Sequence, residues 1–203
     1  RLSPEKRVNQ LLDVWPAVRA AHPAATLLIL GTGPQESVLR QQAGDGVLFC
    51  GRVDNVAPHL QASDLFVLPS ATEGLSNALL EALAVGLPVI ATNVGGAPDV
   101  VEHGHGGWLI PPDQPEQLQE ALVTLLADPF QCRQFGQLAR LRIERDYALP
   151  AVAQRLRRLY DSVLAAHGRM VVEPSQLRDT VPQSEPAEMY PANVPDEQRS
   201  HAA

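Results

Sequence analysis

The sequence predicts an α/β protein with a parallel β-sheet that carries helices on both faces. Five short aliphatic runs have the character of buried strands, and a segment with a helical pattern separates each run from the next. Strands that alternate with helices in this way are typical of a parallel sheet. Glycine-containing turns follow several of the runs, as expected where a strand ends and the chain turns towards a helix.

The predicted strands are short, continuous and rich in aliphatic residues, which indicates burial on both faces of the sheet. They cover Thr26–Leu30, Val47–Cys50, Leu65–Leu68, Pro88–Ala91 and Trp108–Ile110.

Helices are predicted between these strands and after the last of them. They cover Pro4–Ala21, Gln35–Gln42, Val56–Gln61, Leu75–Val85, Ala97–Glu102, Pro115–Ala127, Phe130–Arg145 and Pro150–Ala166. Ser3 is placed to cap the first helix, with Pro4 in its first turn. Pro16 lies inside this helix and is expected to kink it or split it in two.

The helical pattern ends near Gly168. We therefore predict one domain at residues 1–167, of which 114–167 is helical only, and a disordered tail at 168–203. The tail contains five prolines among Gln, Glu and Ser residues. This composition cannot bury enough apolar surface to offset the conformational entropy of the chain.

Composition excludes several classes of function. The 203 residues carry a net charge of −7, which argues against a nucleic-acid-binding surface. No apolar run approaches the roughly 20 residues that span a bilayer. Cys50 and Cys132 predict neither a disulfide framework nor a metal site, and a reducing cytoplasm fits them. The chain opens at Arg1 within motif-like sequence and is expected to be a fragment of a longer protein.

The segment Glu73–Glu81 is the strongest candidate site. Two carboxylates bracket a glycine-led turn that runs from a strand end into a helix. If the intervening residues are helical, the two Cα atoms lie roughly 12 Å apart along the axis, a span similar to that from sugar to ribose in a nucleotide sugar. The N–H groups of the helix start suit a phosphate, and ligands bind at this end of parallel strands. Alternatively, Glu73 complements the helix dipole and Glu81 is an exposed helical residue.

Basic residues near two turns form further candidate sites. Arg1 and Lys6 flank the loop before the first helix and can neutralise a diphosphate, or they are two solvated basic residues. Arg52 and Val53 follow the second strand, where they line a nucleobase pocket or form a surface turn with Asp54 as a helix cap.

Three glycine-rich loops favour structural roles. Gly31–Pro34 lacks the remainder of a G-x-G-x-x-G motif, so a tight turn is favoured over a phosphate loop. The pair Gly95–Gly96 favours close packing over ligand contact. His103 and His105 have no clear third ligand nearby and indicate a surface loop, so no metal site is predicted.

In this order, the motifs closely resemble the C-terminal half of the retaining glycosyltransferases of family 4, which have the GT-B fold. The matching stretches are Arg1–Lys6, Leu27–Gly33, Phe49–Arg52, Ala62–Ser70, Glu73–Glu81, Gly86–Ala91, Gly95–Gly96, Gly107 and Asp128–Pro129. The resemblance covers residues 1–166 and is specific for the superfamily, but it does not identify the donor or the acceptor. It implies a Rossmann-like domain that binds a nucleotide sugar and takes part in hexosyl transfer with retention of configuration.

The resemblance also implies a role for each candidate residue. Glu73 would bind the donor sugar at the reacting centre, and Arg1 and Lys6 would stabilise the leaving diphosphate; these three are the predicted catalytic residues. The predicted donor-binding residues are Arg52 and Val53 near the base, Gly74, Leu75, Ser76 and Asn77 at the sugar and phosphate, and Glu81 at the ribose. The scheme requires no metal or other cofactor.

The partners that the resemblance implies are a nucleotide-sugar donor, an acceptor that is a sugar, lipid or polysaccharide, and an N-terminal domain. Without that domain, the chain is expected to bind the donor weakly and not to turn it over. The helix Pro150–Ala166 is expected to expose an apolar face that packs against the missing half. The protein is expected in the cytoplasm or at the inner face of the membrane. Two alternatives are a nucleotide-sugar epimerase of the same fold and a noncatalytic binding or scaffold module.

Overall fold

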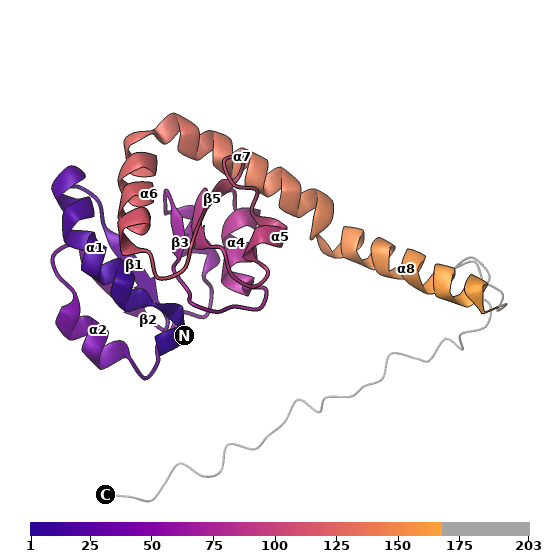
Figure 1. Cartoon of the computed structure of the whole chain (residues 1–203), viewed down its shortest axis with the longest axis horizontal. Coiled ribbons are helices and arrows are strands. Elements are labelled where there is room, and N and C mark those ends of the chain that lie inside the picture. The colour runs from indigo at the N-terminus through magenta and orange to yellow at the C-terminus, as the bar shows by residue number, and fades with distance from the viewer. Residues whose placement is uncertain (168–203) are drawn as a thin grey trace, which may run out of the picture. The chain divides into compact units, whose positions relative to one another are not determined.

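The structure is a computed structural model that describes residues 1–167, so the predicted disordered tail, 168–203, lies outside the described residues. The chain divides into two compact units, Arg1–Gln154 and Arg155–Ala203. Figure 1 labels most of the elements. In chain order they are η1 (Pro4–Lys6), α1 (Val8–Ala21), β1 (Leu27–Leu30), α2 (Glu36–Gln42), β2 (Val47–Gly51), α3 (Ala57–Gln61), β3 (Phe66–Leu68), α4 (Asn77–Ala84), β4 (Val89–Thr92), α5 (Ala97–Val100), β5 (Gly107–Ile110), α6 (Pro115–Ala127), α7 (Pro129–Asp146) and α8 (Leu149–Ala166).

Every strand pair is parallel, which confirms the predicted α/β class. The strands form two sheets, however, where the sequence predicted one: β1 pairs with β2, and β3–β4–β5 form the second sheet. β1 and β3 are not hydrogen-bonded to each other, and residues of both strands line the same cavity.

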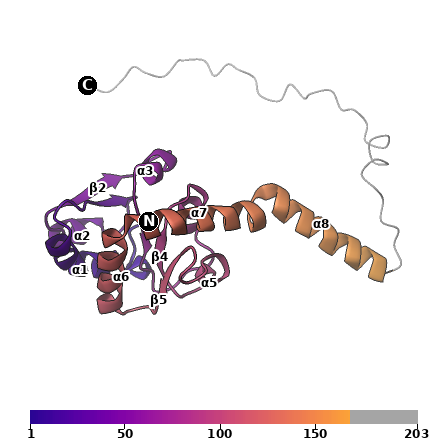
Figure 2. The same ribbon diagram turned by 90° about the horizontal axis from the view of Figure 1, so that it is seen from above.

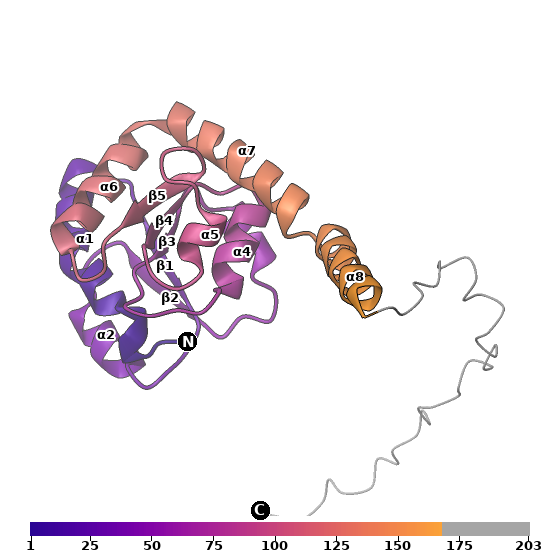
Figure 3. The same ribbon diagram turned by 45° about the vertical axis from the view of Figure 1, so that its right-hand side comes forward.

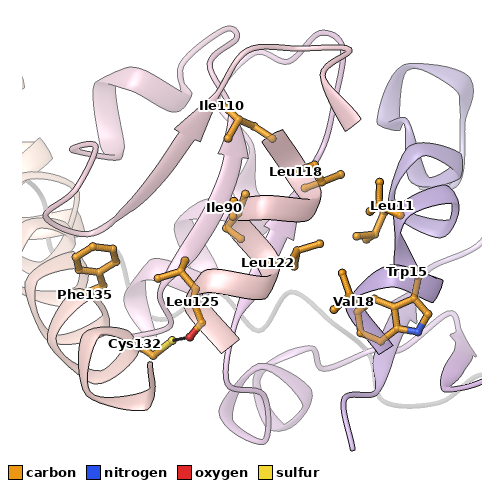
Figure 4. Close-up of a cluster of buried hydrophobic side chains, with 12 residues drawn as sticks. Leu11, Trp15, Val18, Ile90, Ile110, Leu118, Leu122, Leu125, Cys132 and Phe135 are labelled. Atoms are coloured by element: carbon orange, nitrogen blue, oxygen red, sulfur yellow. Dashed lines mark hydrogen bonds between the residues drawn. The ribbon is translucent and has the colours of Figure 1, made fainter. Parts of the chain in front are cut away.

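Helices cover both faces of the β3–β4–β5 sheet (Figure 3). On one face, α1 and α6 pack together with the start of α7 around Ile90 of β4 (Figure 4). On the other face, α4, α5 and the second half of α7 pack around Val89 and Ala91. The alternation of these three β4 residues between the two cores is the period of two that a strand imposes.

A third, smaller core lies beside the β1–β2 sheet, where α1 also contacts α2 (Figure 2). It contains Leu12 of α1, Ile29 of β1 and Leu39 of α2, together with Leu2 from the start of the chain. The N-terminal segment is therefore packed into the domain.

The first helix differs from its prediction. It consists of η1 and α1, and the break falls at Arg7 (φ 50°), whereas Pro16 lies inside an uninterrupted α1. The predicted split at Pro16 is wrong, because Trp15 and Val18 are buried on the same face to either side of the proline and hold the helix against the core. The Ser3 hydroxyl does not cap η1; it donates to the Glu5 carboxylate instead (2.5 Å).

None of the helices within residues 1–167 combines the length and the apolar character needed to cross a membrane. α8 has no buried residue. Leu156, Leu159, Tyr160 and Val163 are exposed on it, in agreement with the expected exposed apolar face.

Candidate functional site

The Glu73–Glu81 segment leads from the end of β3 into α4, as predicted, but the helix begins later than expected. α4 starts at Asn77, and the hydroxyl oxygen of Ser76 accepts a hydrogen bond from the Leu79 N–H (3.4 Å). A serine in this position fixes a helix start because its side chain satisfies an N–H that has no partner within the helix. Gly74 and Leu75 therefore belong to the loop, and the separation expected from a continuous helix does not apply.

The Glu73 carboxylate is held by two side chains. Its Oε1 atom forms an ion pair with Lys6 Nζ and accepts a hydrogen bond from Ser70 Oγ (2.9 Å). The Glu73 side chain is only 11% exposed and that of Lys6 27%, so solvent screens this pair less than a surface pair. Two predicted catalytic residues that are 67 positions apart thus lie in direct contact.

Three further hydrogen bonds anchor the loop that carries Glu73. The Ala71 N–H donates to the Glu5 carbonyl (2.8 Å), which ties the loop to η1. The Gly96 N–H donates to the Gly74 carbonyl (2.8 Å), and Thr92 Oγ1 donates to the Ser70 carbonyl (2.5 Å). The position of Glu73 is therefore set by η1, by the end of β4 and by the turn that follows β4.

The turn after β4 lies directly beneath this loop. Gly95 has a φ of 55°, and a Cβ atom added to it would lie 1.9 Å from the Glu73 carbonyl oxygen. A Cβ on Gly96 would lie 3.1 Å from Cδ1 of Leu75. The prediction that these glycines serve close packing is confirmed.

A cavity of about 770 Å³ opens beside Lys6. Six of the ten predicted site residues line it: Arg1, Lys6, Arg52, Val53, Ser76 and Glu81. Glu73, Gly74, Leu75 and Asn77 are not among its lining residues, and Glu73 is connected to it through Lys6. Away from these polar residues, the cavity continues between β1 and β3, where its walls are apolar.

Positive charge gathers at the polar end of the cavity. Arg1 and Arg52 are exposed there, and Lys6 is half-buried. The hydrogen bond from Ser3 lowers the pKa of the Glu5 carboxyl, and the nearby Arg1 and Lys6 charges act in the same direction. The free N–H groups at the start of α4 add partial positive charge on another side. Such an arrangement can neutralise an anionic group such as a diphosphate.

The remaining predicted sites have structural roles. A Cβ on Gly33 would lie 2.2 Å from the Leu2 carbonyl oxygen, so this loop is the tight turn that was favoured. The Ala57 N–H donates to the Asn55 side chain (3.1 Å), which takes the place expected for Asp54 at the start of α3. His103 Nδ1 accepts from the Leu109 N–H (3.0 Å). Within residues 1–167, no group of three His, Cys, Asp or Glu side chains is placed to hold a metal ion.

Sequence reasoning missed two residues that hold the site. Ser70 and Thr92 are both buried and act on Glu73 directly and through the backbone, respectively. The sequence pointed to Ser70, because this residue lies at the end of a predicted strand and three positions before Glu73. No feature of the sequence pointed to Thr92, because its contact with Ser70 joins two strand ends that only the fold brings together.

Comparison with known proteins gives a consistent assignment. The sequence model of the family described as "Glycosyl transferases group 1" matches residues 1–128. The GDP-mannose-dependent monoacylated alpha-(1-6)-phosphatidylinositol monomannoside mannosyltransferase of Corynebacterium glutamicum is 36% identical over 174 residues. That match covers 80% of this chain and 45% of the relative, so the chain spans about half the length of the curated relatives it matches.

Solved structures agree with this match. Sucrose-phosphate synthase from Thermosynechococcus elongatus superposes with a TM-score of 0.70 at 31% identity, over 82% of this chain and 44% of that one. Anabaena Alr3699/HepE in complex with UDP superposes with a TM-score of 0.70 at 26% identity, over 79% of this chain and 47% of that one. The fold is that of one half of a GT-B glycosyltransferase.

Proposed function

Because this chain belongs to the family of group 1 glycosyl transferases, we propose that it is the donor-binding half of a retaining family 4 enzyme that transfers a hexosyl group from a nucleotide-diphosphate sugar. The observation that carries the proposal is the meeting of Lys6 and Glu73 at the end of β3, beside a cavity that Arg1, Arg52 and Glu81 also line.

The basic residues act on the leaving diphosphate. Glycosyl transfer develops negative charge on the departing phosphate, and fixed positive groups stabilise this charge more in the transition state than in the ground state. Lys6 is held in place by its ion pair, whereas the exposed Arg1 is free to form a bidentate contact with phosphate oxygens. The N–H groups from Gly74 to Asn77 complete the phosphate and sugar contacts.

Glu73 acts at the donor sugar. Its carboxylate is fixed by Ser70 and Lys6 and retains acceptor capacity for a sugar hydroxyl, since a carboxylate offers about four lone-pair sites. Its negative charge also opposes the positive charge that develops on the sugar as the bond to phosphate breaks. Because cations and N–H groups neutralise the diphosphate, the reaction needs no divalent metal.

The nucleoside lies between α4 and the turn after β2. Glu81 is exposed on α4 and lines the cavity, so its carboxylate can accept both ribose hydroxyls. Arg52 and Val53 contact the base. The Corynebacterium relative is named for GDP-mannose, whereas the Anabaena protein binds UDP, so the nucleotide titration below is designed to identify the base.

The acceptor, which is a sugar, lipid or polysaccharide, binds to the other half of the full-length enzyme. We expect this chain alone to bind the donor weakly and not to turn it over, because the chain spans about half the length of its relatives. The exposed apolar side chains of α8 provide contacts for that half.

The test is a calorimetric titration of the chain with UDP, GDP and ADP, with and without EDTA, alongside Glu81→Ala. We expect one nucleotide to bind, EDTA to have no effect, and the substitution to weaken binding. Unchanged affinity in Glu81→Ala would contradict the donor site and favour a scaffold. Turnover of a nucleotide-sugar panel by the chain alone would contradict its dependence on the other half, and release of an epimerised sugar would favour an epimerase.

A further inference from the structure

Within residues 1–167, two residues other than glycine have a left-handed backbone, and these two form an ion pair with each other. Arg7 has a φ of 50° and Asp113 a φ of 55°. Arg7 Nε lies 3.1 Å from Asp113 Oδ1, although the two residues lie in distant parts of the sequence. A Cβ atom makes this backbone conformation unfavourable, so such a residue persists only where its surroundings fix it. The pairing of the two exceptions therefore indicates a specific contact.

Arg7 forms the junction between η1 and α1. Its N–H donates to the Pro4 carbonyl (3.2 Å), and its carbonyl accepts from the Gln10 N–H (3.0 Å). The backbone angles of Arg7 therefore set the direction in which α1 leaves η1. Lys6 directly precedes this junction and carries the side chain that pairs with Glu73. A change in the φ of Arg7 would move Lys6 relative to α1.

Asp113 belongs to the loop between β5 and α6, and it also receives a hydrogen bond from α1. The Gln10 side chain donates from Nε2 to Asp113 Oδ1 (2.7 Å), the same oxygen that pairs with Arg7. α1 has no acidic residue in its first turn and no side-chain cap of its own. The Asp113 carboxylate therefore supplies, from a distant loop, the negative charge that the N-terminus of a helix favours.

The neighbouring residues Lys6 and Arg7 contact loops at the ends of two different strands. Lys6 pairs with Glu73 after β3, and Arg7 pairs with Asp113 after β5. β4 lies between these two strands in the sheet, so the junction of η1 and α1 spans the carboxyl end of β4. Loss of the Asp113 contact would release this junction on the β5 side.

The exposure of the pair separates its effect on geometry from its effect on stability. The side chains of Arg7 and Asp113 are 38% and 53% exposed, so solvent screens their charges. Exposed ion pairs of this kind add little to the free energy of unfolding. The effect of this pair is therefore expected in the orientation of η1.

We propose that Arg7 and Asp113 are positioning residues that hold Lys6 against Glu73 during sugar transfer. Without the ion pair, the Arg7 backbone relaxes from its left-handed conformation, and η1 turns relative to α1. Lys6 Nζ then moves away from the place where negative charge develops on the phosphate, and the transition state loses part of its stabilisation. The effect on Lys6 concerns this chain alone, whereas the effect on the reaction rests on the proposed function.

The sequence provides a direct reporter, because Lys6 is its only lysine. An amine-selective ester therefore modifies one side chain of the 203-residue chain, and peptide mass spectrometry distinguishes it from the terminal amine. The reaction rate is compared in the unaltered chain, in Arg7→Gln and in Asp113→Asn; asparagine also tolerates a left-handed backbone. Glu36→Gln is the matched control, because it removes a partly exposed ion pair with Arg40 (2.9 Å) on α2.

We expect Lys6 to react about 5–10-fold faster in Arg7→Gln and in Asp113→Asn, because its side chain leaves Glu73 more often, and at an unchanged rate in Glu36→Gln. In the full-length enzyme, both variants should lower kcat about 10-fold with little change in donor KM or in unfolding by urea. The double variant should be no more impaired than either single variant, since both substitutions remove the same contact.

An unchanged Lys6 reaction rate in both variants would overturn the proposal. Losses of kcat that add up in the double variant would also overturn it, because the two residues would then act separately. Faster modification together with an unchanged kcat would refute the positioning role and the proposed action of Lys6 on the diphosphate. The modification assay does not depend on the reaction, so a failure of the proposed function is recognised separately.

Discussion

Replacement of Gly95 by alanine should displace the loop that carries Glu73. Gly95 has a φ of 55°, and a Cβ there would lie 1.9 Å from the Glu73 carbonyl oxygen and 2.7 Å from that of Gly74. Both oxygens belong to backbone, so a rotamer change cannot relieve the contact. The Gly96 N–H also donates to the Gly74 carbonyl, so a shift of the loop away from Gly95 strains this hydrogen bond.

Two costs determine how much Gly95→Ala lowers the free energy of unfolding. A left-handed backbone costs a residue with a Cβ about 1–2 kcal/mol, and forcing extra volume into a packed region costs about 1–3 kcal/mol. We therefore expect Gly95→Ala to lower the free energy of unfolding by about 2–5 kcal/mol. The loop must withdraw by about 1 Å, and a displacement of that size at a reaction centre lowers the rate about 100-fold.

Gly104→Ala is the matched control. Gly104 has a φ of 81°, but a Cβ there meets no atom within 4 Å. It should therefore show only the backbone cost of about 1–2 kcal/mol, with unchanged donor use. Unfolding in urea measures the stability of both variants. The donor kcat/KM of the full-length enzyme, measured where both variants are folded, reports the site. Equal stability losses together with an unchanged kcat/KM in Gly95→Ala would refute the reasoning.

Three other perturbations test separate parts of the molecule. Ser70→Ala removes a hydrogen bond to a charged group and should lower kcat of the full-length enzyme about 10-fold while donor KM changes little; an unchanged kcat would show that Ser70 does not position Glu73. Glu81→Gln should weaken nucleotide binding about 10-fold in calorimetry, whereas Glu120→Gln, an exposed helical control, should not; equal effects would remove Glu81 from the site. Burial raises the pKa of the Cys132 thiol in the folded protein above its ordinary value of 9.0. Above pH 9.0 the unfolded chain loses this proton before the folded protein does, so the free energy of unfolding should fall as the pH rises towards the raised pKa of the folded state. In urea titrations between pH 8 and 10, Cys132→Ala should make the free energy of unfolding less dependent on pH, whereas Cys50→Ala should leave this dependence unchanged. The same pH dependence in both variants would contradict the attribution to Cys132.

The strands could be predicted closely from the sequence. Each of the five ends within one residue of its prediction at both boundaries, because a continuous aliphatic run bounded by glycine or proline leaves little choice. Helix starts were less certain. Ser76 has the residue type of a cap, but the preceding glycine and leucine fit a helix as well, and only the Leu79 contact decides between them.

The contacts that build the site lay beyond sequence reasoning. Lys6 meets Glu73 only because η1 and the end of β3 come to the same edge, and the Thr92 hydroxyl reaches Ser70 only across two paired strands. The separation of the sheets was equally hidden. A list of strands gives no neighbours, and the prediction of a single sheet did not name any.

The two predicted phosphate-binding cations differ in how they are fixed, and the difference follows from the fold. Lys6 is bound to Glu73, and the Glu5 carbonyl next to it receives the Ala71 N–H, so η1 and the Glu73 loop form one connected unit within this chain. Arg1 is exposed, and its neighbour Leu2 donates its N–H to the Thr32 carbonyl. We therefore expect contacts within this chain to set the position of Glu73, and the exposed Arg1 side chain to be free to adjust to a phosphate group.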